Sequence, residues 1–263
     1  MKGIEDAAQL IAERALKGLQ IVSFTGAGIS RESGIPTFRG DDGIWQQHDP
    51  EDVATLRGFL DDPERAWRFH EQLREICLAS EPNPAHLALA WLHNIVNEIA
   101  SASLITQNID GLHQAAGSTD VSEIHGSAHR ARCVKCEFAT DDLPPEFAEL
   151  PPRCDCGELL RPGVVWFGEQ LPADIFHDAQ ARAEAASVML VIGTSATVQP
   201  AASLPVIAMQ AGADLIEINP LPTAFTPVAT VRLSGPAGVI LPQLAEATGD
   251  LLNGRPDSSA DTE

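Results

Sequence analysis

The segment from Ile21 to Gly40 constrains the fold most strongly, because an apolar run in it turns directly into a glycine-rich loop. The run is rich in β-branched and aromatic residues, which predicts a buried strand over Gln20–Phe24. The triplet Gly26-Ala27-Gly28 follows, and its residues are small enough for backbone amides to approach a ligand closely. A helix beginning near Ser30 would point its free N–H groups and the positive end of its dipole at the same ligand. The segment therefore indicates a cradle for the phosphates of a nucleotide, with an ordinary turn as the alternative.

Strand-like and helix-like segments alternate along the rest of the chain. The expected strands are Ser103–Thr106, Ser122–Ile124, Val164–Phe167, Val188–Ile192 and Asp214–Ile218. The expected helices are 5–17, 64–78, Ala85–Ile99, Pro172–Ala186, a segment ending at about Gln210, and Val239–Ala247. Such alternation, with a small or polar turn after most strands, predicts the α/β class and a Rossmann-like, doubly wound parallel sheet. Ligands bind such sheets at the carboxyl ends of the strands.

The charge of the chain limits its partners. Its net charge is −20, from 37 acidic and 17 basic residues. This balance argues against nucleic acid, which binds clustered Lys and Arg, and suits a cationic partner such as a lysine-bearing segment. Acidic residues interrupt the N-terminal segment, where a signal peptide needs an apolar core, and no apolar stretch reaches membrane-spanning length. We therefore expect a cytoplasmic protein with no direct nucleic-acid partner and no membrane partner.

Four of the five cysteines form two close pairs, Cys133 with Cys136 and Cys154 with Cys156. Four thiolates at this spacing can close a tetrahedral zinc site, and in a reducing compartment a metal is favoured over disulfides. Because all four ligands would be sulfur, no position would remain for an activated water, so the zinc would be structural. The fifth, Cys77, lies beside Ile76 on the apolar face of the 64–78 helix and is expected in the core.

Changes in composition divide the chain into parts. Residues 1–127 and 161–252 are expected to form the Rossmann-like catalytic domain, with a helical insertion at about 41–80. Residues 128–160, rich in cysteine, proline and charge, are expected to form a small inserted zinc-binding domain of ribbon type. Residues 253–263 are polar, have nothing to bury and are expected to be a disordered tail.

Several motifs occur in one order along the chain. They are G-A-G-I-S-R-E-S-G-I-P-T-F-R-G (26–40), T-Q-N-I-D-G-L-H (106–113), I-H-G (124–126), the four cysteines, R-P-G-V-V-W-F-G-E (161–169), G-T-S (193–195) and I-N-P (218–220). Together they resemble the sirtuin (Sir2-like) family of NAD-dependent protein-lysine deacylases over roughly residues 20–240. The likeness is greatest to the bacterial class III branch.

The resemblance implies NAD as co-substrate, one structural Zn²⁺, and acylated lysine-containing proteins or peptides as substrates. In such enzymes the acyl oxygen attacks C1′ of the nicotinamide ribose, nicotinamide leaves, and a histidine acts as base on the ribose hydroxyls of the alkylimidate. His125 and Asn108 match the catalytic positions. The cofactor-binding positions are Gly26, Ala27, Gly28, Ile29, Thr37, Phe38, Arg39, Trp45, Gln107, Asn108, Ile109, Asp110, Gly193, Thr194, Ser195, Asn219 and Ala237. The substrate-binding positions are His70, Leu73, Val165, Phe167, Gly168 and Glu169.

One departure from the family pattern concerns the acyl group. Desuccinylating members carry a Tyr and, three residues on, an Arg that pair with an acyl carboxylate, whereas the matching positions here are His70 and Leu73. A buried succinyl carboxylate would lack its bidentate partner and keep its desolvation cost. The chain is therefore expected to prefer acetyl or another uncharged acyl group, unless Arg74 replaces the missing cation.

Other functions stay open at this point. The chain could transfer ADP-ribose to protein, or could use NAD and zinc only to shape a peptide-binding groove. A dehydrogenase fits less well, since the third glycine of the dinucleotide fingerprint would fall at Arg31 and no acidic residue follows in the expected place.

Overall fold

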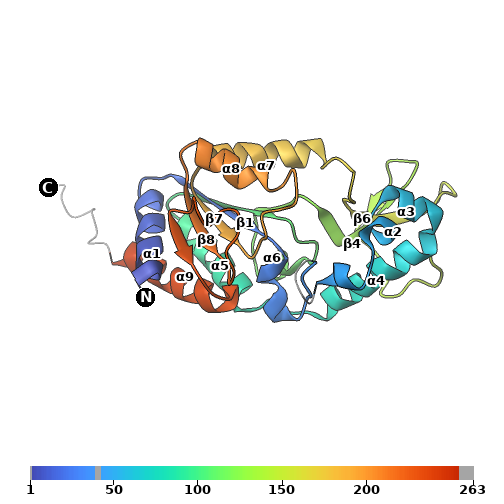
Figure 1. Ribbon diagram of the computed structural model, residues 1–263, viewed down its shortest axis with the longest axis horizontal. Helices are drawn as coiled ribbons and strands as arrows, with labels where there is room; N and C mark the ends of the chain where they lie inside the picture. Colours follow the sequence, from blue (N-terminus) through green and yellow to red (C-terminus); the bar gives the residue numbers. More distant parts are fainter. Residues whose placement is uncertain (1, 39–42, 255–263) are drawn as a thin grey trace.

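The larger of two β-sheets is a six-stranded parallel sheet with the order β3-β2-β1-β7-β8-β9, in the computed structural model of residues 2–38 and 43–254 (Figure 1). Its strands are β1 (Gln20–Thr25), β2 (Ser101–Thr106), β3 (Val121–Glu123), β7 (Ala186–Ile192), β8 (Asp214–Ile218) and β9 (Val231–Leu233). The central strands are buried on both faces, which explains their nearly continuous apolar sequences. The α/β class and the Rossmann-like parallel sheet are therefore confirmed.

Helices cover both faces of this sheet (Figure 1). Helices α1 (Lys2–Ala15), α5 (Pro84–Asn97) and α9 (Ala237–Asn253) bury their apolar residues in one cluster against one face. Helices α7 (Ala173–Ala185) and α8 (Ser203–Gln210) form a second cluster on the other face. A short helix, α6 (Leu112–Ala115), follows β2 and leads towards β3 at the edge of the sheet.

A smaller lobe lies beyond the carboxyl edge of the large sheet. Its antiparallel sheet has the order β5-β4-β6, built from β4 (Gly126–Cys133), β5 (Ala139–Thr140) and β6 (Leu160–Val164). Three helices of the 41–80 insertion, α2 (Pro50–Val53), α3 (Leu56–Asp61) and α4 (Pro63–Ala79), share one apolar cluster with this sheet. The indole N–H of Trp67 on α4 donates to the Leu160 carbonyl at 2.7 Å and joins the helices to the sheet.

Local sequence signals explain where the two longest helices of the middle region begin. The Asp62 carboxylate accepts from the Arg65 N–H at 3.0 Å and caps α4, with proline at the first helical position. Asn83 caps α5 in the same way, and the His86 side chain closes a capping box by accepting from the Asn83 N–H.

The structure also corrects several expectations. Val164–Phe167 does not rejoin the large sheet: β6 ends at Val164 in the small sheet, and Phe167 instead bridges Thr55 of the insertion. The turn after β1 continues into single-turn 3₁₀ helices, Ala27–Ile29 and Arg31–Ser33, rather than a long helix with an appreciable dipole. Ile76 is exposed, because α4 buries the face that carries Phe69, Leu73 and Cys77.

Other differences concern the C-terminal third and the ends of the chain. Strand β9 was not expected, and α9 is longer than the predicted 239–247 segment. Residues 255–263 of the expected tail lie outside the described residues, while Asn253 ends α9. The exact boundaries of the expected domains stay predictions. No helix in the described part of the chain is long and apolar enough to cross a membrane.

Two backbone turns approach each other closely at the carboxyl ends of β1 and β7. The Gly28 N–H donates to the Gly193 carbonyl at 2.8 Å, and a Cβ on Gly28 would lie 2.7 Å from that oxygen. Gly193 has a φ of +60°, and a Cβ there would lie 2.5 Å from the Ile29 nitrogen. Only glycine fits the space at both positions, and the left-handed φ of Gly193 favours glycine there as well.

Replacing Gly193 by alanine is expected to destabilise the fold more than the same change at Gly18. Gly18 has a similar φ of +69°, but no atom lies within 4 Å of the added Cβ. Gly18→Ala therefore costs only the strain of a left-handed alanine, about 1–2 kcal/mol of folding free energy. Gly193→Ala adds a backbone clash to the same penalty. Urea unfolding of the two variants measures the difference, and equal losses of stability would contradict the argument.

Candidate active site

A cleft of about 1090 Å³ lies at the carboxyl edge of the large sheet and continues between the sheet and the smaller lobe. Most predicted site residues line this cleft. They are Gly26, Ala27, Gly28, Thr37, Phe38, Trp45, His70, Leu73, Gln107, Asn108, Ile109, His125, Val165, Phe167, Gly168, Glu169, Gly193, Thr194, Ser195, Asn219 and Ala237. Ile29 and Asp110 do not line it, and Arg39 lies outside the described residues. Residues from all parts of the chain thus meet in one cavity.

The cofactor end of the cleft is formed by the turns at Gly26–Gly28 and Gly193–Ser195. Two amides hold the second turn: Gln107 Nε2 donates to Thr194 Oγ1, and Asn219 Nδ2 donates to the Thr194 carbonyl, each at 2.9 Å. The glycines let the two turns touch, because a Cβ on Gly28 or Gly193 would overlap the backbone of the other turn, and small residues line the cleft there. This arrangement fits the pyrophosphate of a dinucleotide.

Asn108 is oriented by a buried chain of polar groups behind the cleft wall. Its Nδ2 donates to Ser30 Oγ at 3.1 Å, and Ser30 Oγ donates to Asp110 at 2.7 Å. The other oxygen of Asp110 accepts from the Leu112 N–H at 2.9 Å. Asp110 does not line the cleft and reaches Asn108 through Ser30, while its role in the cofactor site stays a prediction.

His86 supports Ser30, a role that no motif in the sequence indicates. Its Nδ1 accepts from the Asn83 N–H, so Nε2 carries the proton and can donate to Ser30 Oγ at 3.3 Å. Burial lowers the pKa of His86 to about 4, which keeps the ring neutral. Ser30 belongs to the 26–40 motif, but nothing in the local sequence links it to a histidine 56 residues away.

His125 lies where β3 gives way to β4, between the two lobes. Its Nδ1 is 3.1 Å from the Gln107 carbonyl oxygen. A carbonyl only accepts, so Nδ1 carries the proton and Nε2 is left as an acceptor in the cleft wall. Burial lowers the pKa of His125, and the Gln107 carbonyl offsets this in part. The ring is therefore neutral near pH 7, in the form required of a general base.

Five residues of the cleft lining, Trp45, Phe69, His70, Leu73 and Phe167, are called the acyl pocket here, because the family resemblance implies the acyl group at this place. The Trp166 indole N–H donates to His70 Nε2 at 3.0 Å, and burial lowers the pKa of His70 to about 4. His70 is thus a neutral ring, not a cation.

Arg74 points away from the acyl pocket. It pairs with Glu71 and donates to the Pro144 carbonyl at 2.6 Å, with its side chain 6% exposed. It does not line the cleft.

The Glu169 carboxylate is engaged within the protein. It forms an ion pair with Arg161, lies 3.2 Å from Arg132, and accepts from the Trp166 N–H at 3.0 Å. Burial alone would raise the pKa of Glu169, but the bonds from Arg161 and Trp166 lower it overall. Glu169 therefore fixes the loop that carries Phe167.

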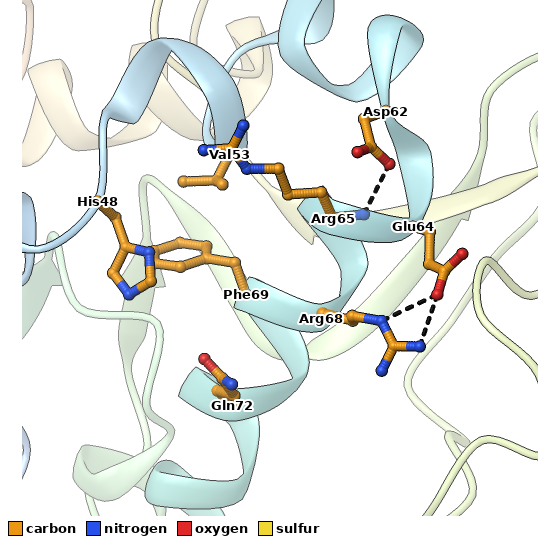
Figure 2. A pocket seen from close by; sticks show the side chains of 8 residues that line it. All are labelled: His48, Val53, Asp62, Glu64, Arg65, Arg68, Phe69 and Gln72. Atoms are coloured by element: carbon orange, nitrogen blue, oxygen red, sulfur yellow. Dashed lines mark hydrogen bonds and ion pairs between the residues drawn. The ribbon is translucent and has the colours of Figure 1, made fainter.

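A second, smaller hollow of about 480 Å³ opens beside the acyl pocket (Figure 2). We call it the outer hollow. It is lined by His48, Val53, Asp62, Glu64, Arg65, Arg68, Phe69 and Gln72. No motif or periodicity in the sequence indicates this hollow.

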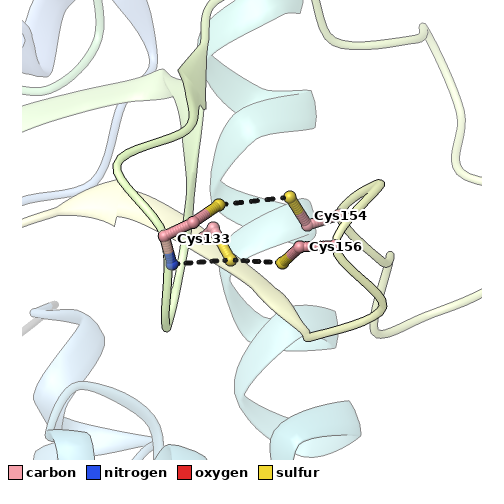
Figure 3. Close-up of side chains that lie close together, drawn as sticks. Cys133, Cys154 and Cys156 are labelled. Atoms are coloured by element: carbon pink, nitrogen blue, oxygen red, sulfur yellow. Dashed lines mark hydrogen bonds between the residues drawn. The ribbon is translucent and has the colours of Figure 1, made fainter.

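The four clustered cysteines converge in the smaller lobe (Figure 3). Their Sγ atoms all lie within 4.8 Å of one another, and two of the separations, Cys133 to Cys156 and Cys136 to Cys154, are 3.6 Å. The edge of a ZnS₄ tetrahedron with Zn–S bonds of about 2.3 Å is about 3.8 Å, so the cluster fits zinc. The Cys136 and Lys135 N–H groups point at Cys133 Sγ and lower the pKa of its thiol to about 6, which favours the thiolate ligand.

Taken together, the parallel sheet, the glycine cradle and the cysteine cluster define a dinucleotide-binding protein with a small zinc module beside its cleft. The Sir2 family model matches residues 26–200. NAD-dependent protein deacylase 2 of Pyrobaculum aerophilum is 48% identical over 238 residues, 90% of this chain and 94% of that protein. The chain belongs to the Sir2 family.

Solved structures agree with this assignment. A Sir2 homologue in complex with NAD is 43% identical, with a TM-score of 0.85 over 93% of this chain and 94% of that one. A Sir2 protein bound to a myristoylated histone peptide is 36% identical, with a TM-score of 0.76 over 97% of this chain and 99% of that one. The resemblance inferred from the motifs is therefore confirmed.

Replacing one clustered cysteine is expected to remove the metal, whereas replacing Cys77 is not. The purified protein should contain about one zinc per chain, and Cys154→Ser should lose it because a structural site needs all four ligands. Cys77 is buried among apolar residues, so Cys77→Ser tests the loss of a thiol without the loss of a ligand. Atomic emission measures the zinc, and retention of full zinc by Cys154→Ser would contradict the assignment.

Proposed function

We propose that this protein is an NAD-dependent protein deacylase that transfers acyl groups from lysine side chains to ADP-ribose, with release of nicotinamide. The supporting observation is that one cleft joins His125 and Asn108 to the glycine cradle at one end and to the acyl pocket at the other. The relatives at this level of identity are named NAD-dependent protein deacylases. The substrates are acyl-lysine segments of proteins.

Gly26–Gly28 and Gly193–Ser195 would hold the pyrophosphate of NAD, because the small residues there leave the cleft open for it. Ala237 and Asn219 of the cleft lining would contact the adenosine, and Phe38 and Asn108 the nicotinamide. When bound, NAD supplies the reactive bond between nicotinamide and ribose C1′, and nicotinamide is the group that the acyl oxygen displaces.

Two polar side chains then act on the reacting ribose. His125 Nε2 removes a hydroxyl proton, because Nδ1 is held by the Gln107 carbonyl and the ring is neutral. Asn108 contributes an amide whose orientation is fixed by Ser30 before any substrate binds. Phe167 and Trp45 exclude water from the acyl-lysine side chain.

The acyl group is acetyl or another uncharged chain. His70 is neutral, Leu73 is apolar, and Arg74 is held by Glu71 and the Pro144 carbonyl, so these three residues offer no cation to an acyl carboxylate. An unpaired carboxylate would keep a desolvation cost of a few kcal/mol in the acyl pocket.

Nicotinamide release from NAD should depend on an acetyl-lysine peptide, and the succinyl version of that peptide should be processed at least about tenfold more slowly in kcat/KM, because its carboxylate stays unpaired. Both the release and the fate of labelled ADP-ribose are measured. The label should appear in a soluble acyl ester.

Three outcomes would contradict the proposal. Release that ignores the peptide would argue against deacylation, and label on protein would indicate ADP-ribose transfer instead. Faster succinyl removal would refute the acyl preference alone.

The acid limb of kcat/KM should lie below pH 6.5, the ordinary pKa of histidine, because burial lowers the pKa of His125. The base form persists to lower pH, so activity stays level through neutrality and falls only on further acidification. His125→Ala should lower kcat about 100-fold or more, and its pH profile should no longer show the acid limb. His177→Ala, on the exposed surface of α7, is the matched control and should keep the wild-type profile.

We also propose that the protein works in the cytoplasm, where clustered thiols remain available as zinc ligands. The net charge of −20 favours lysine-bearing protein substrates over nucleic acid or anionic membranes.

A further inference from the structure

The cleft and the outer hollow meet at one side chain. Phe69 of α4 lines both cavities, and it is only 4% exposed (Figure 2). Two consecutive residues of the insertion also lie on opposite sides of this wall: Val53 lines the outer hollow and Ala54 lines the cleft. The wall between the two cavities at this point is therefore the ring of Phe69.

A series of rings leads from the cleft to this wall. Trp45 contacts Phe167 edge-on at 5.8 Å and stacks on Phe69 at 5.7 Å. On the other side of the wall, His48 meets Phe69 edge-on at 4.9 Å. A chain that enters beside Phe167 and follows these rings reaches Phe69 and stops there.

We propose that Phe69 sets the length of acyl chain that the enzyme accepts, and that the outer hollow would hold the distal part of a long fatty acyl chain if this ring were removed. The inference rests on the proposed deacylase function and deepens it. Phe69 is a specificity-determining residue, because it limits the acyl group without contacting the reacting atoms.

The outer hollow has a polar rim, whose charges are paired, and an apolar floor. Arg65 pairs with Asp52 at 2.6 Å and Arg68 with Glu64 at 2.5 Å, so the arginines already have partners. The buried floor of the hollow is Val53 and Phe69, both apolar. The arginine side chains are more than half exposed, and their stems can cover an alkyl chain that ends at the surface.

The test compares acetyl, butyryl, octanoyl and myristoyl forms of one lysine peptide. The wild type should lose activity steeply as the chain lengthens. Phe69→Ala should raise the ratio of myristoyl to acetyl kcat/KM by about tenfold or more, since each accommodated methylene contributes to binding. Leu73→Ala is the matched control, because Leu73 lines the cleft but not the outer hollow. This variant should raise kcat/KM for the butyryl peptide and leave the ratio of myristoyl to acetyl kcat/KM low.

A double variant links the gain to the outer hollow. Gln72 lines the outer hollow and not the cleft, so Gln72→Trp should leave wild-type acetyl activity unchanged. In the Phe69→Ala background it should cancel the myristoyl gain by filling the hollow. Acetyl turnover and thermal unfolding of each variant confirm that it is folded.

The outcomes separate this inference from the function on which it rests. A wild type that turns over no acyl-lysine peptide with NAD would refute the proposed function. A wild type that processes acetyl and myristoyl peptides equally well, or a Phe69→Ala variant with an unchanged length profile, would refute the role of Phe69 alone. A myristoyl gain that survives Gln72→Trp would refute the role of the outer hollow.

Discussion

The close passage of two turns at the carboxyl edge of the large sheet is the constraint on which the site depends. Strands β1 and β7 are parallel neighbours in register, so the turns that follow them emerge side by side. The Gly28 N–H reaches the Gly193 carbonyl at 2.8 Å only because neither residue has a side chain. The floor of the cleft is consequently backbone, and no side chain at these two glycines blocks an approaching ligand.

Buried polar groups convert this floor into a site with fixed geometry. Asp110, Ser30 and Asn108 form one chain of hydrogen bonds, and His86 supports it from α5. Each of these hydrogen-bond donors has an acceptor. Burial therefore stabilises this one arrangement of the side chains, because any other arrangement would leave a buried polar group unpaired. Asn108 is therefore oriented before the substrate arrives, and no reorganisation is needed at that moment.

The smaller lobe keeps its charged side chains out of the acyl pocket by pairing them elsewhere. Arg161 and Glu169 pair behind the loop of Phe167, and Arg74 pairs with Glu71 on the far side of α4. Both arginines have almost fully buried side chains, and each has a carboxylate partner. The face of α4 that remains for the pocket carries His70 and Leu73, which are uncharged. The proposed selectivity for an uncharged acyl chain rests on this distribution rather than on the composition of the lobe.

The sequence by itself determined the parallel sheet, the glycine cradle, the cysteine cluster and the family, because each depends on local periodicity or on short motifs in a fixed order. Only the tertiary structure decided that Asp110 lies behind the wall, that Arg74 faces away from the acyl pocket, and that Phe69 separates two cavities. These are matters of side-chain direction and of contacts between distant segments. Periodicity places a residue on a helix face, but the partner that the side chain meets there comes from elsewhere in the chain. For the same reason Val164–Phe167, apolar enough for a core strand, was assigned to the wrong sheet.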